Sequence, residues 1–277
     1  MELGLENKVA IITGGAAGIG KATVEVLLEE GAIPIVVDKD SDALFDFSKN
    51  KIFKSRQCIF CPYDLTRDEN CHSVITQTIN RFRRIDILVN NVGGNDFLPI
   101  YTTTPQRFRE SLNLNLVVPY AMSFYAWTEL IKSKGNIVFV GSKVSLVGEC
   151  RHGGTIAYAA AKGGVNGLTM QLATTSASEN LGIRVNCILP GKVNTYVKKA
   201  YPGCVEDGLR IEGRDIPFGK RITEPEEIAY NIAILASDKV SGHTTGEIIV
   251  VDGGYTKLDR NAHIPLKPDL FKSHTNL

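Results

Sequence analysis

The sequence predicts a doubly wound α/β fold, with one seven-stranded parallel sheet in a single domain. Apolar runs of strand length alternate with helix-length amphipathic segments along the chain. The runs are continuous in Val, Ile and Leu, as expected for strands that are covered on both faces. This alternation implies right-handed βαβ units, and 277 residues suffice for one large domain of this kind but not for two.

Each strand candidate is followed by a segment that can carry the chain back along the sheet. The expected strands are Val9–Thr13, Ile33–Asp38, Gln57–Tyr63, Ile85–Asn90, Asn136–Gly141, Arg184–Leu189 and Glu247–Asp252. The expected helices are Gly18–Glu30, Asp68–Arg81, Phe108–Lys132, Ile156–Asn180 and Pro225–Ser237. Residues 196–223, rich in Gly, Pro and charge, are expected to form a lid. The domain is expected to span residues 1–254, before a polar tail (255–277) that is disordered or packed on a neighbouring subunit.

The first strand leads into the glycine-rich loop TGGAAGIG and then directly into a helix. Gly14 allows the tight turn, Gly18 lets the backbone approach a pyrophosphate, and Gly20 permits close packing of the helix on the strand. The N-terminus of the helix offers backbone N–H donors and a positive dipole end to phosphates. A glycine trio alone could be an ordinary turn. The strand before it and the helix after it favour a dinucleotide-binding Rossmann fold.

Asp38 ends the second strand, 18 residues after Gly20. A carboxylate at this place can accept hydrogen bonds from the adenosine ribose hydroxyls and repels a 2′-phosphate, which favours NAD over NADP. Lys39 is the opposing signal, because a cation beside the ribose could tolerate that phosphate. The glycine loop has no basic residue of its own, so we expect NAD as the cofactor. The alternative is that Asp38 only caps the next helix.

Tyr158 and Lys162 lie one helical turn apart in YAAAK, and therefore on the same helix face. A tyrosine with its usual pKa of about 10 is a poor base at neutral pH, and a nearby lysine cation would lower that pKa. This spacing is common by chance on exposed helices. Its weight comes from Ser142, at the carboxyl end of the fifth strand, where ligands bind in open α/β sheets.

On these motifs the chain resembles the short-chain dehydrogenases/reductases over essentially its whole length. Residues 13–20 match the family's TGxxxGxG, residues 90–93 match its NNAG with Val in place of Ala, and residues 190–195 match its PGxVxT. The resemblance implies an oxidoreductase with the catalytic residues Asn115, Ser142, Tyr158 and Lys162. Besides Gly14, Gly18, Gly20, Asp38 and Lys39, it implies cofactor contacts from Ala17, Ile19, Asp64, Leu65, Asn91, Val92, Gly93, Tyr158, Lys162, Pro190, Gly191, Val193 and Thr195.

The resemblance also implies a role for each catalytic residue. Tyr158 takes the hydroxyl proton while hydride passes to the nicotinamide, and Ser142 stabilises the charge that develops on the substrate oxygen. Lys162 holds the ribose and lowers the pKa of Tyr158. Asn115 kinks its helix and positions a water in a proton relay, and Thr195 binds the nicotinamide carboxamide.

The spacing of serine and tyrosine departs from the family. The usual interval places the serine 13 residues before Tyr158, at Ser145, whereas Ser142 lies 16 residues before it. Matching VGSKVSLVGE to the family's ISSxxxxxGx, with Gly148 as the anchor, instead places a three-residue insertion after Glu149. We expect Ser142 to be the catalytic serine and Ser145 to be the alternative.

Within the family the chain resembles the L-fucose dehydrogenases most, on Asn95-Asp96, the Ser142-Lys143 pair and the run from Thr244 to Arg260. The implied reaction oxidises the anomeric hydroxyl of a pyranose to a lactone. A sugar needs fixed donors and acceptors, because an unpaired buried polar group costs about 1–3 kcal/mol. The expected substrate contacts are Asn95, Asp96, Ser142, Glu149, His152 and Tyr158. Asn95 and Asp96 could instead be turn formers, and His152 could be solvated in an enlarged loop.

Two other functions compete with a sugar dehydrogenase. One is a dehydrogenase of another secondary alcohol, such as a hydroxysteroid, although the polar lid argues against a steroid pocket. The other is a catalytically silent NAD(H) sensor that regulates a partner. The full catalytic set argues against a sensor, because binding a cofactor does not require it.

Composition and cysteine usage set the expected context of the protein. A formal net charge of +1 gives no global field for nucleic acid or an anionic membrane. The N-terminus lacks the basic flank and apolar run of a signal peptide, and no apolar stretch reaches the roughly 20 residues of a membrane span. Cys58 and Cys61 form a CxxC, which we interpret as two reduced thiols in a buried strand. We expect a cytoplasmic homotetramer that binds NAD and a small-molecule substrate, without a metal ion.

Overall fold

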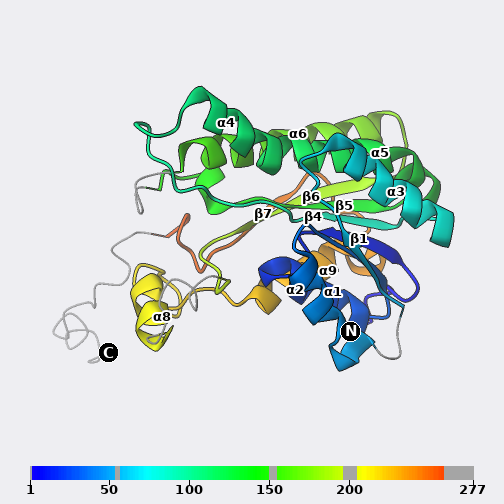
Figure 1. Ribbon diagram of the computed structural model, residues 1–277, viewed down its shortest axis with the longest axis horizontal. Coiled ribbons are helices and arrows are strands. Elements are labelled where there is room, and N and C mark those ends of the chain that lie inside the picture. Colours follow the sequence, from blue (N-terminus) through cyan, green and yellow to red (C-terminus); the bar gives the residue numbers. More distant parts are fainter. Residues whose placement is uncertain (1, 54–56, 150–154, 196–204, 259–277) are drawn as a thin grey trace, which may run out of the picture.

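A seven-stranded sheet runs through the molecule in the order β3-β2-β1-β4-β5-β6-β7, and each neighbouring pair is parallel (Figure 1). The structure is a computed structural model that describes residues 2–53, 57–149, 155–195 and 205–258. The strands are β1 (Val9–Thr13), β2 (Ile33–Asp38), β3 (Ile59–Pro62), β4 (Ile87–Asn90), β5 (Asn136–Val140), β6 (Arg184–Pro190) and β7 (Ile248–Val251). This sheet, in a single domain, confirms the predicted doubly wound Rossmann architecture.

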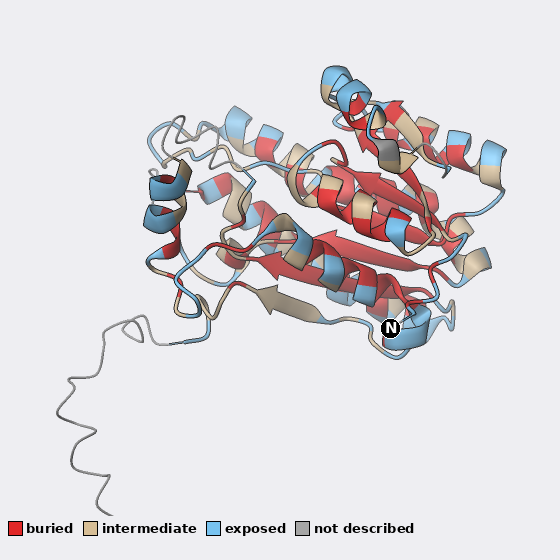
Figure 2. Cartoon of the chain, turned by 90° about the horizontal axis from the view of Figure 1, so that it is seen from below, coloured by how far each residue is buried: buried red, intermediate tan, exposed pale blue. Residues whose placement is uncertain are grey.

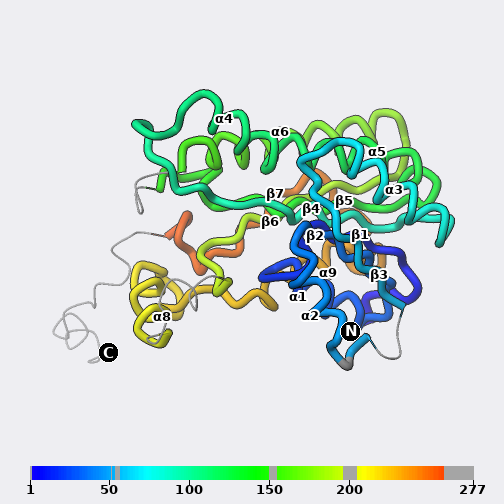
Figure 3. The backbone as a smooth tube through the Cα atoms, in the orientation of Figure 1, coloured from blue at the N-terminus to red at the C-terminus, as the bar shows by residue number. Residues whose placement is uncertain are grey.

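Helices cover both faces of the sheet. In Figures 1 and 3, α1, α2 and α9 lie on one face, whereas α3, α4, α5 and α6 lie on the other. The helices are α1 (Gly18–Glu29), α2 (Ser41–Ser48), α3 (Asp68–Phe82), α4 (Pro105–Leu112), α5 (Val118–Ser133), α6 (Ile156–Ser178), α8 (Val205–Gly213), α9 (Pro225–Ala236) and α10 (Asp238–Ser241). Within the described part of the chain, every helix is too short or too polar to cross a membrane.

Alternate residues of each strand face opposite helix layers. In β1, Ala10 and Ile12 belong to the hydrophobic cluster that includes α1 and α9, whereas Val9 and Ile11 belong to the cluster that includes α3, α5 and α6. Figure 2 shows the sheet and the inner helix faces as buried and the outer helix faces as exposed. Because both faces are covered, the strands have no polar side, which explains the continuous apolar runs in the sequence.

The helix predicted over residues 108–132 is interrupted in the structure. A π-helical turn, Asn113–Val117, joins α4 to α5. Pro119 lacks the N–H that would donate to the carbonyl of Asn115 in a regular α-helix, which accounts for the break. The side chain of Asn115 donates to the carbonyl of Ser111 (3.0 Å). The resemblance implied a kink at Asn115, and the structure has the π-helical turn there.

Three short helices and several element ends differ from the prediction. The sequence does not predict α2, α8 or α10, each of which has fewer than ten residues. Asp40 caps α2 by accepting a hydrogen bond from the N–H of Ala43 (2.9 Å). Helix α8 lies inside the segment 196–223 that we expected to be a lid, and residues 196–204 of that segment lie outside the described residues. Strands β3, β4 and β7 are shorter than expected, because their ends pass out of the sheet.

The carboxyl ends of the strands form the functional edge of the sheet. After β1 the chain enters α1 on one face, and after the neighbouring strand β4 it enters α4 on the other (Figure 1). A doubly wound sheet opens a crevice at such a switch point. Helix α8 and the segment after β7 lie at this end of the molecule (Figure 3). The N–H of Phe218, just after α8, donates to the carbonyl of Gly253 (3.0 Å) and so ties these two segments together.

Candidate active site

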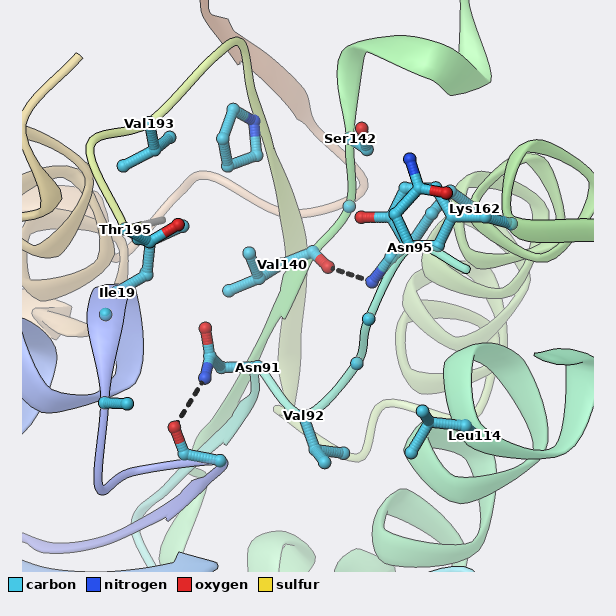
Figure 4. A pocket seen from close by; sticks show the side chains of 18 of the residues that line it. Ile19, Asn91, Val92, Asn95, Leu114, Val140, Ser142, Lys162, Val193 and Thr195 are labelled. Atoms are coloured by element: carbon cyan, nitrogen blue, oxygen red, sulfur yellow. Dashed lines mark hydrogen bonds between the residues drawn. The ribbon is translucent and has the colours of Figure 1, made fainter. Parts of the chain in front are cut away.

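A cavity of about 680 Å³ opens at this edge of the sheet. Its walls come from the glycine loop, from the ends of β2, β4, β5 and β6, and from α6. In Figure 4, Asn91 and Val92 line it on one side, Val193 and Thr195 on another, and Ser142 and Lys162 lie across from them. This volume is within the range of cofactor and small-molecule sites, about 300–1,000 Å³.

The glycine loop leaves the N-terminus of α1 open to an anion. Gly14 and Gly18 have φ values of +65° and +52°, in the left-handed region where a side chain is strained. A Cβ at Gly20 would collide with the carbonyl oxygen of Gly14, so Gly20 packs beneath the loop and does not line the cavity. Ala17 precedes α1 without a side-chain cap, and the first turn of α1 has no acidic residue. The backbone N–H groups there remain available for phosphates.

A hydrogen-bond network ties the loop after β4 to the glycine loop. Nδ2 of Asn91 donates to the carbonyl oxygens of Thr13 (2.9 Å) and Gly14 (3.0 Å) (Figure 4). Oγ1 of Thr13 accepts from the N–H groups of Asn91 and Val92, each at 3.0 Å, and donates to the carbonyl of Val89 (3.2 Å). The network fixes the relative position of two walls of the cavity.

Asp38 lines the cavity at the end of β2. Its carboxylate accepts hydrogen bonds from the N–H groups of Ala16 and Asp40, each at 3.1 Å. The cap of the next helix is Asp40, so the structure rules against the alternative that Asp38 caps α2. Asp38 instead joins the glycine loop to β2 and presents its carboxylate to the cavity.

Lys39, Asp64 and Leu65 line the same end of the cavity. Hydrogen bonds from the hydroxyl and the N–H of Thr66 lower the pKa of Asp64, and the charge of Lys39 lowers it further. Lys39 therefore lies close enough to Asp64 for their charges to interact. An acidic group beside Lys39 reduces the cationic character of this end of the cavity.

Tyr158 lies in the first turn of α6 and faces Ser142 at the end of β5. Burial raises the pKa of Tyr158 to about 12, and a hydrogen bond with Ser142 offsets part of that rise. Both residues line the cavity. The sequence argument expected Lys162 to bring the tyrosine pKa down. In the protein alone, the effect of burial is larger.

Lys162 lies one turn further along α6 and is only 3% exposed. Its Nζ donates to the carbonyl of Val140 (2.7 Å; Figure 4) and lies 5.6 Å from the ring centroid of Tyr158. Burial lowers the pKa of Lys162 to about 8, and interaction with Cys187 acts in the opposite direction. The ammonium is thus anchored to β5 while its side chain lines the cavity.

Asn115 lies behind the wall of the cavity, and it is 1% exposed. Its Oδ1 accepts from the N–H of Gly94 (2.9 Å), and its Nδ2 donates to the carbonyl of the same residue (3.0 Å). A Cβ on Gly93 would lie 2.7 Å from Asn115 Oδ1 and 3.4 Å from Lys162 Nζ. The π-helical turn therefore clamps the loop after β4 next to Lys162.

Ser145, the alternative catalytic serine, has structural partners. Its Oγ donates to the carbonyl of Ser142 (2.7 Å) and accepts from Nδ2 of Asn166 (3.0 Å). Ser142 lines the cavity and Ser145 does not. The geometry thus favours Ser142 for contact with a substrate.

The loop after β6 forms the remaining wall of the cofactor end. Pro190, Gly191, Val193 and Thr195 all line the cavity, as the family resemblance implied. A Cβ on Gly18 would lie 2.9 Å from Cγ2 of Thr195, so the two loops are in close contact. The absence of a side chain at Gly18 thus serves this contact as well as the approach of a phosphate.

The four loop residues expected to bind substrate are not all brought together. Asn95 lines the cavity, and its Oδ1 also accepts from the N–H of Phe97 (3.0 Å), so it does form a turn. Asp96 does not line the cavity, because the turn at Asn95 directs it away. Glu149 lines the cavity, and His152 lies outside the described residues.

Two lysine–glutamate pairs in the cavity were not among the predicted site residues. Lys143 Nζ lies 2.5 Å from Oε2 of Glu149, and Lys192 Nζ lies 3.0 Å from Oε2 of Glu212. All four residues line the cavity. Lys143 could have been singled out because it follows Ser142 directly. Its partner could not, since spacing alone does not show which charges meet.

The CxxC does not form a site in the structure. Cys58 packs against the hydrophobic cluster on one face of the sheet, and Cys61 belongs to the cluster on the other. Burial raises the pKa of these thiols to about 12 and about 11. Both are free, which agrees with reduced thiols in a buried strand. Among the described residues, no group of three or more His, Cys, Asp or Glu side chains could hold a metal ion.

Comparison with protein families places this site in context. Residues 8–202 match the family model described as short chain dehydrogenase. An L-fucose dehydrogenase of Oryctolagus cuniculus is 34% identical over 252 residues, which cover 90% of this chain and 84% of that protein. A 3alpha-hydroxysteroid dehydrogenase of Mediterraneibacter gnavus is 35% identical over 259 residues, covering 90% and 97%.

A solved structure gives the same result for the fold. The ligand-free aldohexose dehydrogenase of Thermoplasma acidophilum superposes with a TM-score of 0.81 at 28% sequence identity, covering 95% of this chain and 98% of that one. The similarity therefore extends across the sheet, the helices and the loops that form the cavity.

Proposed function

This chain belongs to the short-chain dehydrogenase/reductase family, and we propose that it oxidises a sugar hydroxyl with NAD as the hydride acceptor. The observation that carries this proposal is the placement of Ser142 and Tyr158, hydrogen-bonded to each other, on the wall of a cavity that also holds the buried Lys162. The proposed substrate is an L-fucose-like aldose, oxidised at its anomeric carbon to the lactone.

The residues of the glycine loop fit a dinucleotide. The uncapped N-terminus of α1 offers its N–H groups to the phosphates, and Gly18 places no side chain in their way. Asp38 would accept hydrogen bonds from the ribose at one end, and Thr195 would contact the carboxamide at the other. The bound cofactor would supply the hydride acceptor and the positive charge of its oxidised nicotinamide ring.

Tyr158 acts as the base for the substrate hydroxyl in this mechanism. Burial holds its phenol protonated at neutral pH in the protein alone. The ammonium of Lys162 and the charge of an oxidised nicotinamide both favour the phenolate. Ser142 hydrogen-bonds the substrate oxygen and stabilises the negative charge that develops there. Asn115 acts through the loop that it clamps, and a water held near that clamp would connect Lys162 to solvent.

The preference for NAD rests on Asp38. A 2′-phosphate would meet the Asp38 carboxylate at the end of β2, and two negative charges at this distance repel. Lys39 could offset this repulsion. Its interaction with Asp64 supports the view that part of its charge is already balanced.

The polar lining at the substrate end supports a sugar. Asn95, Lys143 and Glu149 surround the space next to Ser142, and burial of such groups is costly unless a ligand or the protein pairs them. A polyhydroxylated ring offers such pairing, and a steroid does not. The names of the L-fucose and aldohexose dehydrogenases to which the chain is similar agree with this interpretation.

A substrate panel tests the proposal directly. Purified protein is mixed with NAD and one of a set of aldoses or steroid alcohols, and NADH formation is followed by absorbance. L-Fucose, or D-arabinose with the same arrangement of ring hydroxyls, should be oxidised faster than any steroid alcohol. Glu149→Ala should raise KM for the sugar far more than KM for NAD. Steroid oxidation without activity on any aldose would overturn the sugar assignment.

The competing function is a hydroxysteroid dehydrogenase. It is favoured by the relative from Mediterraneibacter gnavus, whose sequence identity is as high as that of the L-fucose dehydrogenase. The catalytic steps would be the same. The two functions differ only at the substrate end of the cavity, which the same panel distinguishes.

We also propose that the protein is a cytoplasmic homotetramer. Helices α5 and α6 expose apolar side chains to solvent, among them Phe124 (62% exposed), Tyr120 and Met170. Exposed apolar groups gathered on one face favour contact with another subunit. The four described cysteines are free thiols, which suits a reducing compartment. Light scattering of the purified protein measures the subunit number.

A further inference from the structure

We propose that Lys143 selects the substrate by donating a hydrogen bond to a hydroxyl on the carbon next to the one that is oxidised. This inference rests on the proposed function, because it names the class of alcohol that the same site takes. That class is vicinal diols, which includes the hydroxyls on the first two carbons of a pyranose. A lone secondary alcohol, such as a steroid hydroxyl, lacks the second group.

The burial of Lys143 is the first observation. It is 4% exposed and lines the cavity directly after Ser142. Lysine is rarely buried to this extent unless it is paired. Its partner is Glu149, whose side chain is only 13% exposed. The pair therefore places a desolvated ammonium inside the space where the substrate must lie.

The orientation of the ammonium is fixed from two sides. Glu149 Oε2 lies 2.5 Å from Lys143 Nζ, and the ring centroid of Tyr255 lies 4.1 Å from it. Tyr255 follows β7, so groups from separate loops hold the ammonium in place. An ammonium has three donors, and a ring face engages its charge without requiring an aligned donor. Pairing with Glu149 therefore leaves donor capacity for a ligand in the cavity.

The second pair in the cavity shows what a purely structural lysine looks like. Lys192 Nζ lies 3.0 Å from Glu212 Oε2 and also donates to the carbonyl of Glu212 (3.1 Å). It thereby joins the loop after β6 to α8. Lys192 is bound twice by one residue, whereas Lys143 is bound once by a carboxylate and once by a ring. The comparison assigns ligand contact to Lys143.

Energetics explain why such a pair would discriminate between alcohols. Replacing a buried ion pair by apolar residues often leaves stability unchanged or raises it, so the pair is a poor device for stability alone. A diol that fills the cavity gives the ammonium an acceptor in place of water. An apolar ring displaces that water and gives nothing in return, and a site built to hydrogen-bond a substrate hydroxyl strongly rejects the analogue that lacks it.

The position of Lys143 in the chain identifies which hydroxyl it contacts. Ser142 holds the oxygen that is oxidised, and Lys143 is the next residue on the same wall. The ammonium is therefore placed for a group near the reacting carbon, while Asn95 lies on the opposite side of the cavity near Lys162 (Figure 4). A vicinal hydroxyl meets this requirement.

The experiment compares substrates that differ by one hydroxyl. We measure kcat/KM for L-fucose against 2-deoxy-L-fucose, and for cyclohexane-1,2-diol against cyclohexanol, in the wild type, Lys143→Met and Lys192→Met. In the wild type, loss of the hydroxyl should lower kcat/KM by about 10- to 100-fold, the range of one hydrogen bond to a charged group. Lys143→Met should reduce that ratio to below about 3-fold by removing the donor. Lys192→Met is the matched control, because it breaks the other buried pair, and it should keep the wild-type ratio.

A double variant guards against misfolding. Lys143→Met leaves Glu149 buried and unpaired, whereas Lys143→Met with Glu149→Leu removes both charges and should keep the wild-type melting temperature. The double variant should lose the discrimination as well. Retained discrimination in a folded double variant would overturn the inference.

The outcomes separate this inference from the proposed function. Equal loss of activity on both members of a pair in Lys143→Met would make Lys143 a structural residue and overturn the inference. If the wild type oxidises no aldose but prefers the cyclic diol through Lys143, the sugar assignment fails and the inference stands. If the wild type treats diol and lone alcohol alike, the inference fails even when sugars are oxidised.

Discussion

The two ends of the cavity are built in different ways. At the cofactor end, Asn91 and Thr13 join the loops by hydrogen bonds that mostly involve backbone atoms. At the substrate end, the walls are joined by charged side chains, Lys143 with Glu149 and Lys192 with Glu212, that reach across from separate loops. The first design needs particular residues at fixed spacings. The second needs only that opposite charges meet.

This difference predicts how each end responds to change. A substitution at the centre, where both ends meet, should affect every substrate with either cofactor. A substitution at one end should change selection at that end and leave the other end as it was. The predictions below run from the centre of the cavity, where the largest effects are expected, to its cofactor end.

Tyr158→Phe should have the largest effect. It removes the group that takes the substrate proton, and general acid–base catalysis is worth about 100- to 10,000-fold. The affinity for NADH should stay nearly unchanged, because the ring remains in place. Steady-state rates and NADH fluorescence titration measure the two quantities. A variant that keeps more than a few per cent of the wild-type rate would show that Tyr158 is not the base.

Ser142→Ala should lower kcat by about 100-fold, as expected for loss of a donor to a developing negative charge. Ser145→Ala is the matched control, since its hydroxyl bonds only to protein groups outside the cavity. That variant should cost much less activity and affect mainly stability. The reverse order of effects would show that the family's usual spacing holds and that the insertion was placed wrongly.

The sequence predicts the cofactor end better than the substrate end because of the same difference in design. Gly14, Gly18 and Asp38 are required by backbone geometry and by the ribose, so their identity and spacing are visible in one chain. The position of Glu149 could be inferred only as a loop residue near Gly148. Its pairing with Lys143 depends on how two loops fold against each other, which local spacing does not encode.

Secondary structure follows the same rule. Strand β1 and the start of α6 are set by local apolar pattern and are predicted to the residue. The break between α4 and α5 is set by Pro119, which could have been recognised from its missing N–H. Helix α8 lies in a polar segment without clear periodicity. The Lys192–Glu212 pair ties it to the loop after β6, and no sequence pattern shows that contact.

The pH dependence should report on the centre of the cavity. Because the pKa of Tyr158 is raised, the phenol is protonated at neutral pH, and oxidation should accelerate with rising pH by up to about tenfold per unit until the phenolate predominates. Reduction in the reverse direction should slow over the same range. Ser142→Ala should move the rise in oxidation rate to higher pH, since the hydrogen bond with Ser142 lowers that pKa. A pH-independent oxidation rate from neutral to alkaline pH would contradict the assignment.

Asp38→Ala should have the smallest effect, and it should be confined to the cofactor end. The wild type is expected to use NAD in preference to NADP, and removal of the carboxylate should narrow the gap by about 10-fold, because one repulsive contact with the 2′-phosphate is lost. Lys39 then becomes the nearest charge to that phosphate, which should help NADP further. Measurement of kcat/KM for both cofactors gives the ratio, and the preference between L-fucose and its 2-deoxy analogue serves as the internal control. That preference should not change, since Asp38 lies at the opposite end of the cavity from Lys143. A wild-type preference for NADP would mean that Lys39 outweighs Asp38, and a changed sugar preference would mean that the two ends are not independent.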